Sequence, residues 1–361
     1  MAEKEKEERD VSKHDHCRVT ILVRINDLEI DFSHCIKSLC NQILDDMEVL
    51  FLVPIKDESE KELSEAEIAE KKIKESHQEE KLSILNDYAK KDPRIKIIKT
   101  KVSDYGRLIN AAIKFAKGEY IGIVEPVDYI DPEMYIELFA LAKKHDADIV
   151  RSNYFEHRDE KDRIHESFLA DDADKVIDPA KDTSIFYQPP VVGCGLYKKN
   201  FLLNRDLLFI ENFGNSSQND TFSFKTLAAC NRLVLTEKAY LHHLDLDKKT
   251  PAIKKKEMFK INDEYAEAER YLKRHSGWDI YGKIFQAVKF ASYFYNMLYL
   301  EDKNLEQFML RARAEFHDAD EKGLLAKSYF PKEHWKTLQS ILKYPPRVFL
   351  MTIKKYRKAA K

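Results

Sequence analysis

The chain has 361 residues, of which 43% are hydrophobic and 34% are charged, and only 9 Gly and 11 Pro. This composition excludes collagen-like and low-complexity classes and indicates a folded protein. The 61 Lys and Arg nearly balance the 63 Asp and Glu, for a net charge of -2, which excludes a general electrostatic attraction to nucleic acid or to anionic lipid.

The N-terminal residues 1–16 form a charged run without an apolar core, so we expect a disordered start and no signal peptide. No run of about 18 apolar residues follows, so no transmembrane span is expected. The five cysteines include neither a CxxC pair nor a cluster with His at zinc spacing. Together these features predict a protein of the reducing cytoplasm.

From residue 17 onward, short apolar runs alternate with helical patterns. The runs predict strands at 19–23, 47–53, 95–98, 120–124 and from 148. Helices are expected around Phe32 to Ile43, over 107–117 with Gly118 as the stop, and from Asp131, which would cap a helix with Pro132 at its first position. This alternation predicts a doubly wound, mostly parallel α/β sheet whose ligand crevice lies at the carboxyl ends of the strands.

Between two of these strands lies an insertion at 56–87 that is dense in Glu and Lys. Its sparse apolar residues keep no helical period well, so a solvated helix fits best. The alternative is a contact arm for a protein partner.

Later segments predict a helix at 220–229 and a strand at 232–235, after which periodic apolar and aromatic residues indicate a helical region over 251–361. The main α/β domain is therefore expected to cover 17–250. Residues 348–358 alternate apolar and basic side chains, which suits either a peripheral membrane-surface helix or an ordinary solvated one.

The stretch 117–135 reads KGEYIGIVEPVDYIDPEMY. It resembles the acidic-motif region of the family-2 glycosyltransferases of the GT-A fold, which typically reads KGEYIGIVESDDYIDPDMY. Residues 92–96, 109–112, 146–150 and 196–202 also match, and the resemblance extends over about residues 17–275. The resemblance implies a GT-A-like fold with a doubly wound mixed sheet. It also implies that the protein transfers a sugar from a nucleotide-sugar donor to a bacterial cell-surface glycan or glycolipid.

The resemblance also assigns roles to residues. It implies Asp220 as the base that deprotonates the acceptor hydroxyl, although a simple helix N-cap is an equal alternative for this residue. A divalent metal, Mn or Mg, would be held by Glu125 and Asp128, where Val127 replaces the usual middle acid. The residues that we predict to bind the donor are Asn26, Asp57, Arg107, Glu125, Asp128 and His242.

The chain departs from the family at several acids. Val53 and Pro54 stand where nucleoside-binding acids are usual, and a gapless alignment puts Asn219 at the base. Without a metal, basic side chains would have to neutralise the diphosphate, and the candidates are Arg24, Lys56, Arg107 and His242. Two hypotheses follow: an active glycosyltransferase, favoured by the motif, or a catalytically inactive relative that binds a glycan or a partner enzyme, favoured by the missing acids.

Overall fold

The computed structural model describes residues 17–25, 30–55, 79–158, 161–166, 173–214, 218–244, 258–275 and 277–359. These residues form two compact units. Unit 1 comprises those within Met1–Asp178, Val191–Asn219 and Cys230–Asp245, and unit 2 those within Pro179–Pro190, Asp220–Ala229 and Leu246–Lys361. Two short segments that precede residue 251 in the sequence, 179–190 and 220–229, therefore belong with the C-terminal helices.

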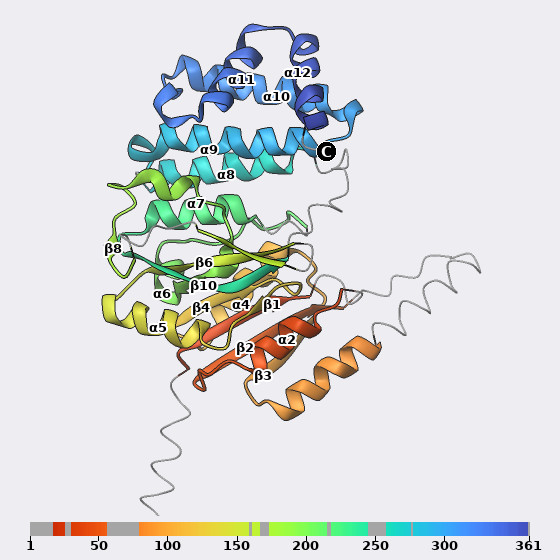
Figure 1. Ribbon diagram of the computed structural model, residues 1–361, viewed down its shortest axis with the longest axis vertical. Helices are drawn as coiled ribbons and strands as arrows, with labels where there is room; N and C mark the ends of the chain where they lie inside the picture. Colours follow the sequence, from red (N-terminus) through yellow and green to blue (C-terminus); the bar gives the residue numbers. More distant parts are fainter. Residues whose placement is uncertain are drawn as a thin grey trace, which may run out of the picture. The chain divides into compact units, whose positions relative to one another are not determined.

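Unit 1 is built on one mixed sheet, which has ten strands within the described residues (Figure 1). The strand order is β3-β2-β1-β4-β9-β6-β10-β5, while β7 pairs with β6 and β8 pairs with β10. The strands are β1 (Val19–Arg24), β2 (Met47–Pro54), β3 (Ile95–Thr100), β4 (Tyr120–Val124), β5 (Tyr129–Ile130), β6 (Ile149–Arg158), β7 (Lys161–His165), β8 (Val176–Ile177), β9 (Gly195–Lys198) and β10 (Leu233–Leu244).

The first four strands of this order run parallel to one another, whereas β9 lies antiparallel between β4 and β6. All six side chains of β1 are buried, as expected for a parallel strand covered on both faces. The predicted doubly wound mixed sheet is confirmed, and the strand expected at 232–235 continues to Leu244. The carboxyl ends of β1, β2 and β4 consequently meet at one edge of the sheet.

The helices of unit 1 are α2 (Ser33–Cys40), α4 (Tyr105–Phe115), α5 (Met134–His145) and α6 (Lys199–Asn204), together with a helix over 79–91. Two predicted boundaries were wrong. The helix predicted at 107–117 is α4, which ends at Phe115 and not at Gly118. Gly118 instead allows close approach to β1, because a Cβ there would lie 2.3 Å from the Thr20 amide nitrogen. The helix predicted from Asp131 is α5, which begins after Glu133, so Asp131 does not cap it.

The charged insertion is only partly described, because residues 56–78 lie outside the described ranges. Its end is the helix at 79–91, which is not wholly solvated: Leu85 is fully buried in the core of unit 1. Lys81 lies over the ring of Phe32. The end of the insertion is thus anchored to the fold.

Unit 2 is helical in its described part, as the sequence predicted for 251–361. Its helices are α7 (Asn219–Ala229, of which 220–229 belong to the unit), α8 (Lys260–Arg274), α9 (Trp278–Tyr299), α10 (Asp302–Glu321), α11 (Lys332–Lys343) and α12 (Pro346–Ala359), with the short 3₁₀ helices η3 (Thr183–Tyr187) and η6 (Lys327–Tyr329). Fully buried aromatic side chains fill its centre, among them Tyr265, Phe285, Phe290, Tyr293, Phe308 and Phe316. None of the helices in the described ranges has the length and apolar character needed to cross a bilayer.

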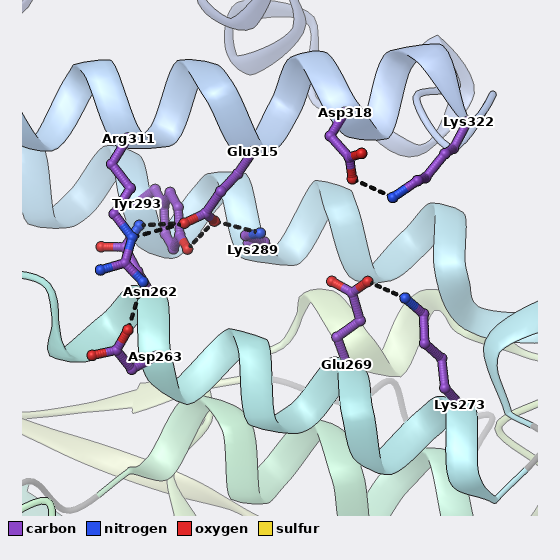
Figure 2. Close-up of polar contacts among 10 residues, drawn as sticks. All are labelled: Asn262, Asp263, Glu269, Lys273, Lys289, Tyr293, Arg311, Glu315, Asp318 and Lys322. Atoms are coloured by element: carbon purple, nitrogen blue, oxygen red, sulfur yellow. Dashed lines mark hydrogen bonds and ion pairs between the residues drawn. The ribbon is translucent and has the colours of Figure 1, made fainter.

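A charged cluster joins three of these helices (Figure 2). The carboxylate of Glu315 on α10 lies 2.7 Å from the ammonium of Lys289 on α9 and accepts a hydrogen bond of 2.7 Å from the Tyr293 hydroxyl. Asn262 on α8 and Arg311 on α10 donate further bonds to it, each of 3.1 Å. Glu315 thus connects α8, α9 and α10.

Candidate functional site

A tight turn after β4 holds the two acids of the acidic motif. The amide of Asp128 donates a 3.0 Å hydrogen bond to the carbonyl of Glu125, which closes a four-residue β-turn with Pro126 at its second position. Proline suits that position because its φ is already fixed near the required value. The sequence Glu125-Pro126-Val127-Asp128 therefore keeps both carboxylates at the end of β4.

Asp128 is buried and is held by β10. Its two carboxylate oxygens each lie 3.1 Å from Nδ1 of His243, and the amide of Leu244 donates to one of them at 3.1 Å. This contact follows from the antiparallel pairing of β5 with β10, in which His242 is opposite Tyr129. The next residue of β10 is therefore brought to Asp128.

Glu125 interacts with Arg24 of β1 and Tyr105 of α4. Arg24, at the end of β1, donates a 2.5 Å hydrogen bond to the carbonyl of Ser103, and its guanidinium lies over the ring of Tyr105. Tyr105, in the first turn of α4, is hydrogen-bonded to Glu125. Burial and the neighbouring Asp128 raise the pKa of Glu125 to about 7, against the opposing effects of Arg24, His243 and the Tyr105 hydrogen bond.

We call Arg24, Tyr105, Glu125, Asp128 and His243 the strand-end cluster. It lies at the carboxyl ends of β1 and β4, where open α/β sheets bind ligands. Burial lowers the pKa of Arg24, and Tyr105, Glu125 and Asp104 oppose this effect, so the guanidinium keeps its charge at any ordinary pH. The cluster combines carboxylates that can accept bonds from ribose hydroxyls with a cation that can offset phosphate charge.

The same residues were tested as a divalent-metal site. Hard cations take six or more oxygen ligands, several of them from protein carboxylates or carbonyls. In the described part of the chain, no three His, Cys, Asp or Glu side chains are grouped to hold a metal ion, and Asp128 is already bonded by His243 and Leu244. Val127 supplies no oxygen from its side chain. Within the described residues, this donor set does not fit a divalent metal.

His242 lies beside this cluster and is firmly held. Its ring stacks between Tyr129, at a centroid distance of 4.3 Å, and Phe155, at 4.5 Å. Its Nε2 is 3.1 Å from Asp131 and its Nδ1 is 3.0 Å from Asp162. Both ring nitrogens therefore engage protein carboxylates, and Asp131, expected as a helix cap, orients this histidine instead.

The other predicted site residues lie in different places. Asn26 and Asp57 are outside the described residues. Arg107 is half exposed in the first turn of α4 and bonds Asn212 at 2.9 Å. Asp220 belongs to unit 2, where it lies in the first turn of α7 and its carboxylate accepts a hydrogen bond of 2.5 Å from Ser292 on α9.

Tyr105 and His243 were not predicted as site residues. A signal for Tyr105 exists, because Asp104 caps α4 by accepting from the Arg107 amide, which fixes Tyr105 at the helix start near the strand ends. For His243 the only signal was its position next to His242. Its pairing with Asp128 joins residues 115 positions apart and depends on strand register.

We expect Glu125→Gln to be more stable than the unchanged protein at pH 8 and nearly equal to it at pH 4.5. The raised pKa of Glu125 means that the folded state keeps a proton between pH 4.5 and about 7 that the unfolded state has lost, so stability falls as the pH rises through about 7. At about 1.4 kcal/mol per pH unit, the advantage of the glutamine at pH 8 is about 3 kcal/mol. Urea unfolding of both proteins at both pH values, without metal or nucleotide, measures the difference in their free energy of unfolding. An equal difference at pH 4.5 and pH 8 would contradict the raised pKa of Glu125.

The strand order and the acids in the turn after β4 are those of a GT-A-like fold. Solved structures agree on the fold. A structure of Staphylococcus aureus TarS, residues 1–349, in complex with UDP-GlcNAc aligns with a TM-score of 0.52 at 15% identity, over 90% of this chain and 91% of TarS. The mannosyltransferase PcManGT from Pyrobaculum calidifontis in complex with GDP-Man and Mn²⁺ aligns with a TM-score of 0.45 at 12% identity, over 96% of this chain and 88% of that chain.

The family is indicated by sequence. Residues 73–208 match the model "Glycosyl transferase family 2". The uncharacterized glycosyltransferase EpsJ of Bacillus subtilis is 27% identical over 40% of this chain, and the poly(ribitol-phosphate) beta-glucosyltransferase of Bacillus spizizenii is 28% identical over 37%. The matches span 36% and 18% of those proteins. The predicted resemblance to the family-2 glycosyltransferases of GT-A fold is confirmed.

Proposed function

We propose that this protein transfers a sugar from a nucleotide-sugar donor to a cell-surface glycan or glycolipid acceptor. The observation that carries the proposal is the family-2 match over residues 73–208, because this region includes the β4 turn with Glu125 and Asp128. TarS, which shares the fold, was solved with UDP-GlcNAc. The relatives are named as glycosyltransferases, and the comparisons give no support to the catalytically inactive alternative.

In this proposal the donor binds at the strand-end cluster. Glu125 and Asp128 accept bonds from ribose hydroxyls, while Arg24 offsets negative charge on the diphosphate. Asn26, Asp57 and Arg107 remain predicted donor contacts. His242 on β10 is assigned a structural role, because it bonds Asp131 just after β5 and Asp162 on β7. Asp220 is the base that takes the proton of the acceptor hydroxyl.

Peripheral contact with a membrane through residues 348–358 and contact with a protein partner through 56–87 stay predictions. In α12, Phe349 and Ile353 are buried within unit 2, whereas Val348 and Met351 are exposed. An acceptor carried by a lipid would suit such an exposed apolar pair.

The test is calorimetric titration with UDP, GDP and UDP-GlcNAc, each with Mn²⁺ and with EDTA. We expect one nucleotide to bind with micromolar affinity that changes less than about threefold on metal removal, because Arg24 supplies positive charge that a metal would otherwise provide. Binding seen only with Mn²⁺ would show that the carboxylates at the β4 turn recruit a metal with the donor. An absence of nucleotide binding under both conditions would overturn the proposed function.

A further inference from the structure

The end of β10 lies opposite the turn over residues 125–128, which we call the acidic turn. In the antiparallel pairing of β5 with β10, His242 is opposite Tyr129. Continuing this register by one residue places His243 opposite Asp128, the last residue of the acidic turn. Directly opposite residues of an antiparallel pair have their side chains on the same face of the sheet. The imidazole and the carboxylate therefore meet across the two strands.

An irregularity in β10 determines which of its side chains reaches Asp128. Thr236 of β10 is opposite Ser152 of β6. Five residues further on, Leu241 is opposite Tyr154, which is only two residues after Ser152. Over this interval β10 thus has three more residues than β6, and an odd number of extra residues exchanges the two faces of a strand. Without this irregularity, the alternation along β10 would turn His243 to the other face of the sheet.

The ring of His243 is fixed between Asp128 and β6. Its Nδ1 lies 3.1 Å from each carboxylate oxygen of Asp128. Tyr154 of β6 packs edge-on against the ring at a centroid distance of 6.2 Å, and Tyr154 is itself buried and stacked on His165. An ionised carboxylate has no proton to donate, so Nδ1 carries the proton and donates to Asp128. The amide of Leu244 adds a further bond of 3.1 Å to the same carboxylate.

Holding Asp128 also holds Glu125. The two residues are the ends of one closed turn, because the amide of Asp128 donates a 3.0 Å hydrogen bond to the carbonyl of Glu125. Two carboxylates in one turn repel each other when both are ionised, so each is stabilised by a donor. Tyr105 is hydrogen-bonded to Glu125, and His243 donates to Asp128. The side chain of Asp128 is 2% exposed and that of His243 is 38% exposed, so the imidazole is the outer member of this pair.

We propose that His243 is a positioning residue for ribose recognition. By holding Asp128 from β10, it keeps the acidic turn in the orientation in which its carboxylates accept hydrogen bonds from the ribose of the donor. The inference rests on the proposed function and names a residue outside the acidic turn on which the choice of donor depends. All the residues involved belong to unit 1. The consequence is selectivity for ribonucleotides, because a carboxylate that is held in place loses a bond when the hydroxyl is missing.

The first experiment measures selectivity for ribose. The nucleotide that binds in the titration, UDP or GDP, is compared by calorimetry with its 2′-deoxy and 3′-deoxy forms. The ratio of two affinities does not depend on how much of a variant is folded. His243→Leu removes the donor, whereas His243→Asn keeps an amide N–H close to the position of Nδ1. His165→Leu is the matched control, because Nδ1 of His165 pairs at 3.3 Å with Glu156, a carboxylate outside the acidic turn.

We expect the unchanged protein to prefer the ribonucleotide to at least one deoxy form by about 10- to 100-fold, as for a hydrogen bond to a charged group. His243→Leu should reduce this preference to less than about threefold, while His243→Asn and His165→Leu should retain it. A preference that His243→Leu leaves unchanged, or that His243→Asn loses equally, would overturn the inference. So would equal binding of all forms by the unchanged protein, which would leave nucleotide binding intact. Absence of UDP and GDP binding would overturn the proposed function, and the inference with it.

The second experiment asks whether His243 acts through Asp128. The affinity for the ribonucleotide is measured in His243→Leu, in Asp128→Asn and in the double variant. If the histidine only positions the carboxylate, the double variant should bind no more than about twofold more weakly than Asp128→Asn alone. Losses that multiply would show that the two side chains act independently, against a positioning role. Should His243→Leu fail to fold, His243→Gln replaces it in both experiments, because its longer side chain carries the amide past the position of Nδ1.

Discussion

Asp220→Asn is expected to lower the rate of sugar transfer by about 10²- to 10⁴-fold, the range that a positioned general base contributes. Asparagine keeps the size and one carbonyl oxygen of the side chain, so the hydrogen bond from Ser292 can be retained. The amide cannot accept the acceptor proton at neutral pH. The measurement is nucleotide release with the acceptor present, alongside the affinity for UDP, which should not change.

The matched control is Asp279→Asn. Asp279 lies in the first turn of α9, as Asp220 does in α7, and its side chain is exposed. Each change removes one negative charge from a helix start. At the exposed Asp279 this removal costs about 0.3–1 kcal/mol. If both variants lose activity equally, the effect is on helix stability; if Asp220→Asn remains fully active, the base is another residue.

The second large effect is expected from Glu315→Gln, which should lower the free energy of unfolding at pH 7 by about 3–5 kcal/mol. The change leaves the ammonium of Lys289 with a neutral partner, and the side chain of Lys289 is only 6% exposed. Figure 2 shows that Tyr293, Asn262 and Arg311 also point at this carboxylate. Lys289→Met should cost less, because Glu315 would keep those three donors.

The acid dependence follows from the pKa of Glu315. Burial alone would raise it, but Lys289 and the hydrogen bonds outweigh burial and hold it below the usual value. The stabilisation is therefore present above the unfolded pKa, near 4.5, and is lost as the pH falls through the folded value. Urea unfolding should show the gap between the unchanged protein and Glu315→Gln closing at low pH.

Asp318→Asn on the same helix provides the control. Asp318 pairs with Lys322 one turn away, and both side chains are more than half exposed. Such pairs contribute about 0.3–0.5 kcal/mol, so this variant should unfold almost as the unchanged protein does. A loss in Asp318→Asn similar to that in Glu315→Gln would contradict the role given to burial.

The strands of unit 1 could be predicted because their β-branched, apolar runs leave little alternative, as the buried residues of β1 show. The helix starts were less predictable. Asp131 and Pro132 have the residue types of a helix start, yet the carboxylate of Asp131 bonds His242, 111 positions away. Local propensity decides a cap only where no distant partner competes for the side chain.

Some residues of the site could not be predicted from the sequence, because they meet their partners only through contacts between distant segments. The acids of the β4 turn were predicted from the motif, whereas the partners His243 and Ser292 were not. Ser292 lies 72 positions from Asp220 in an ordinary amphipathic helix. Nothing in its local pattern separates it from a solvated serine, because its role arises only when α7 and α9 pack together.

The chain enters unit 2 three times, through 179–190, 220–229 and the C-terminal region. During synthesis, Phe186 and Phe224 leave the ribosome well before Tyr281 and Phe285, the rings that they later contact. Until Tyr281 and Phe285 have been synthesised, these aromatic side chains lack their final neighbours and are a hazard for aggregation. The helical region consequently cannot be cut away at a single peptide bond, and a gene truncated near residue 250 would encode a chain with exposed hydrophobic segments.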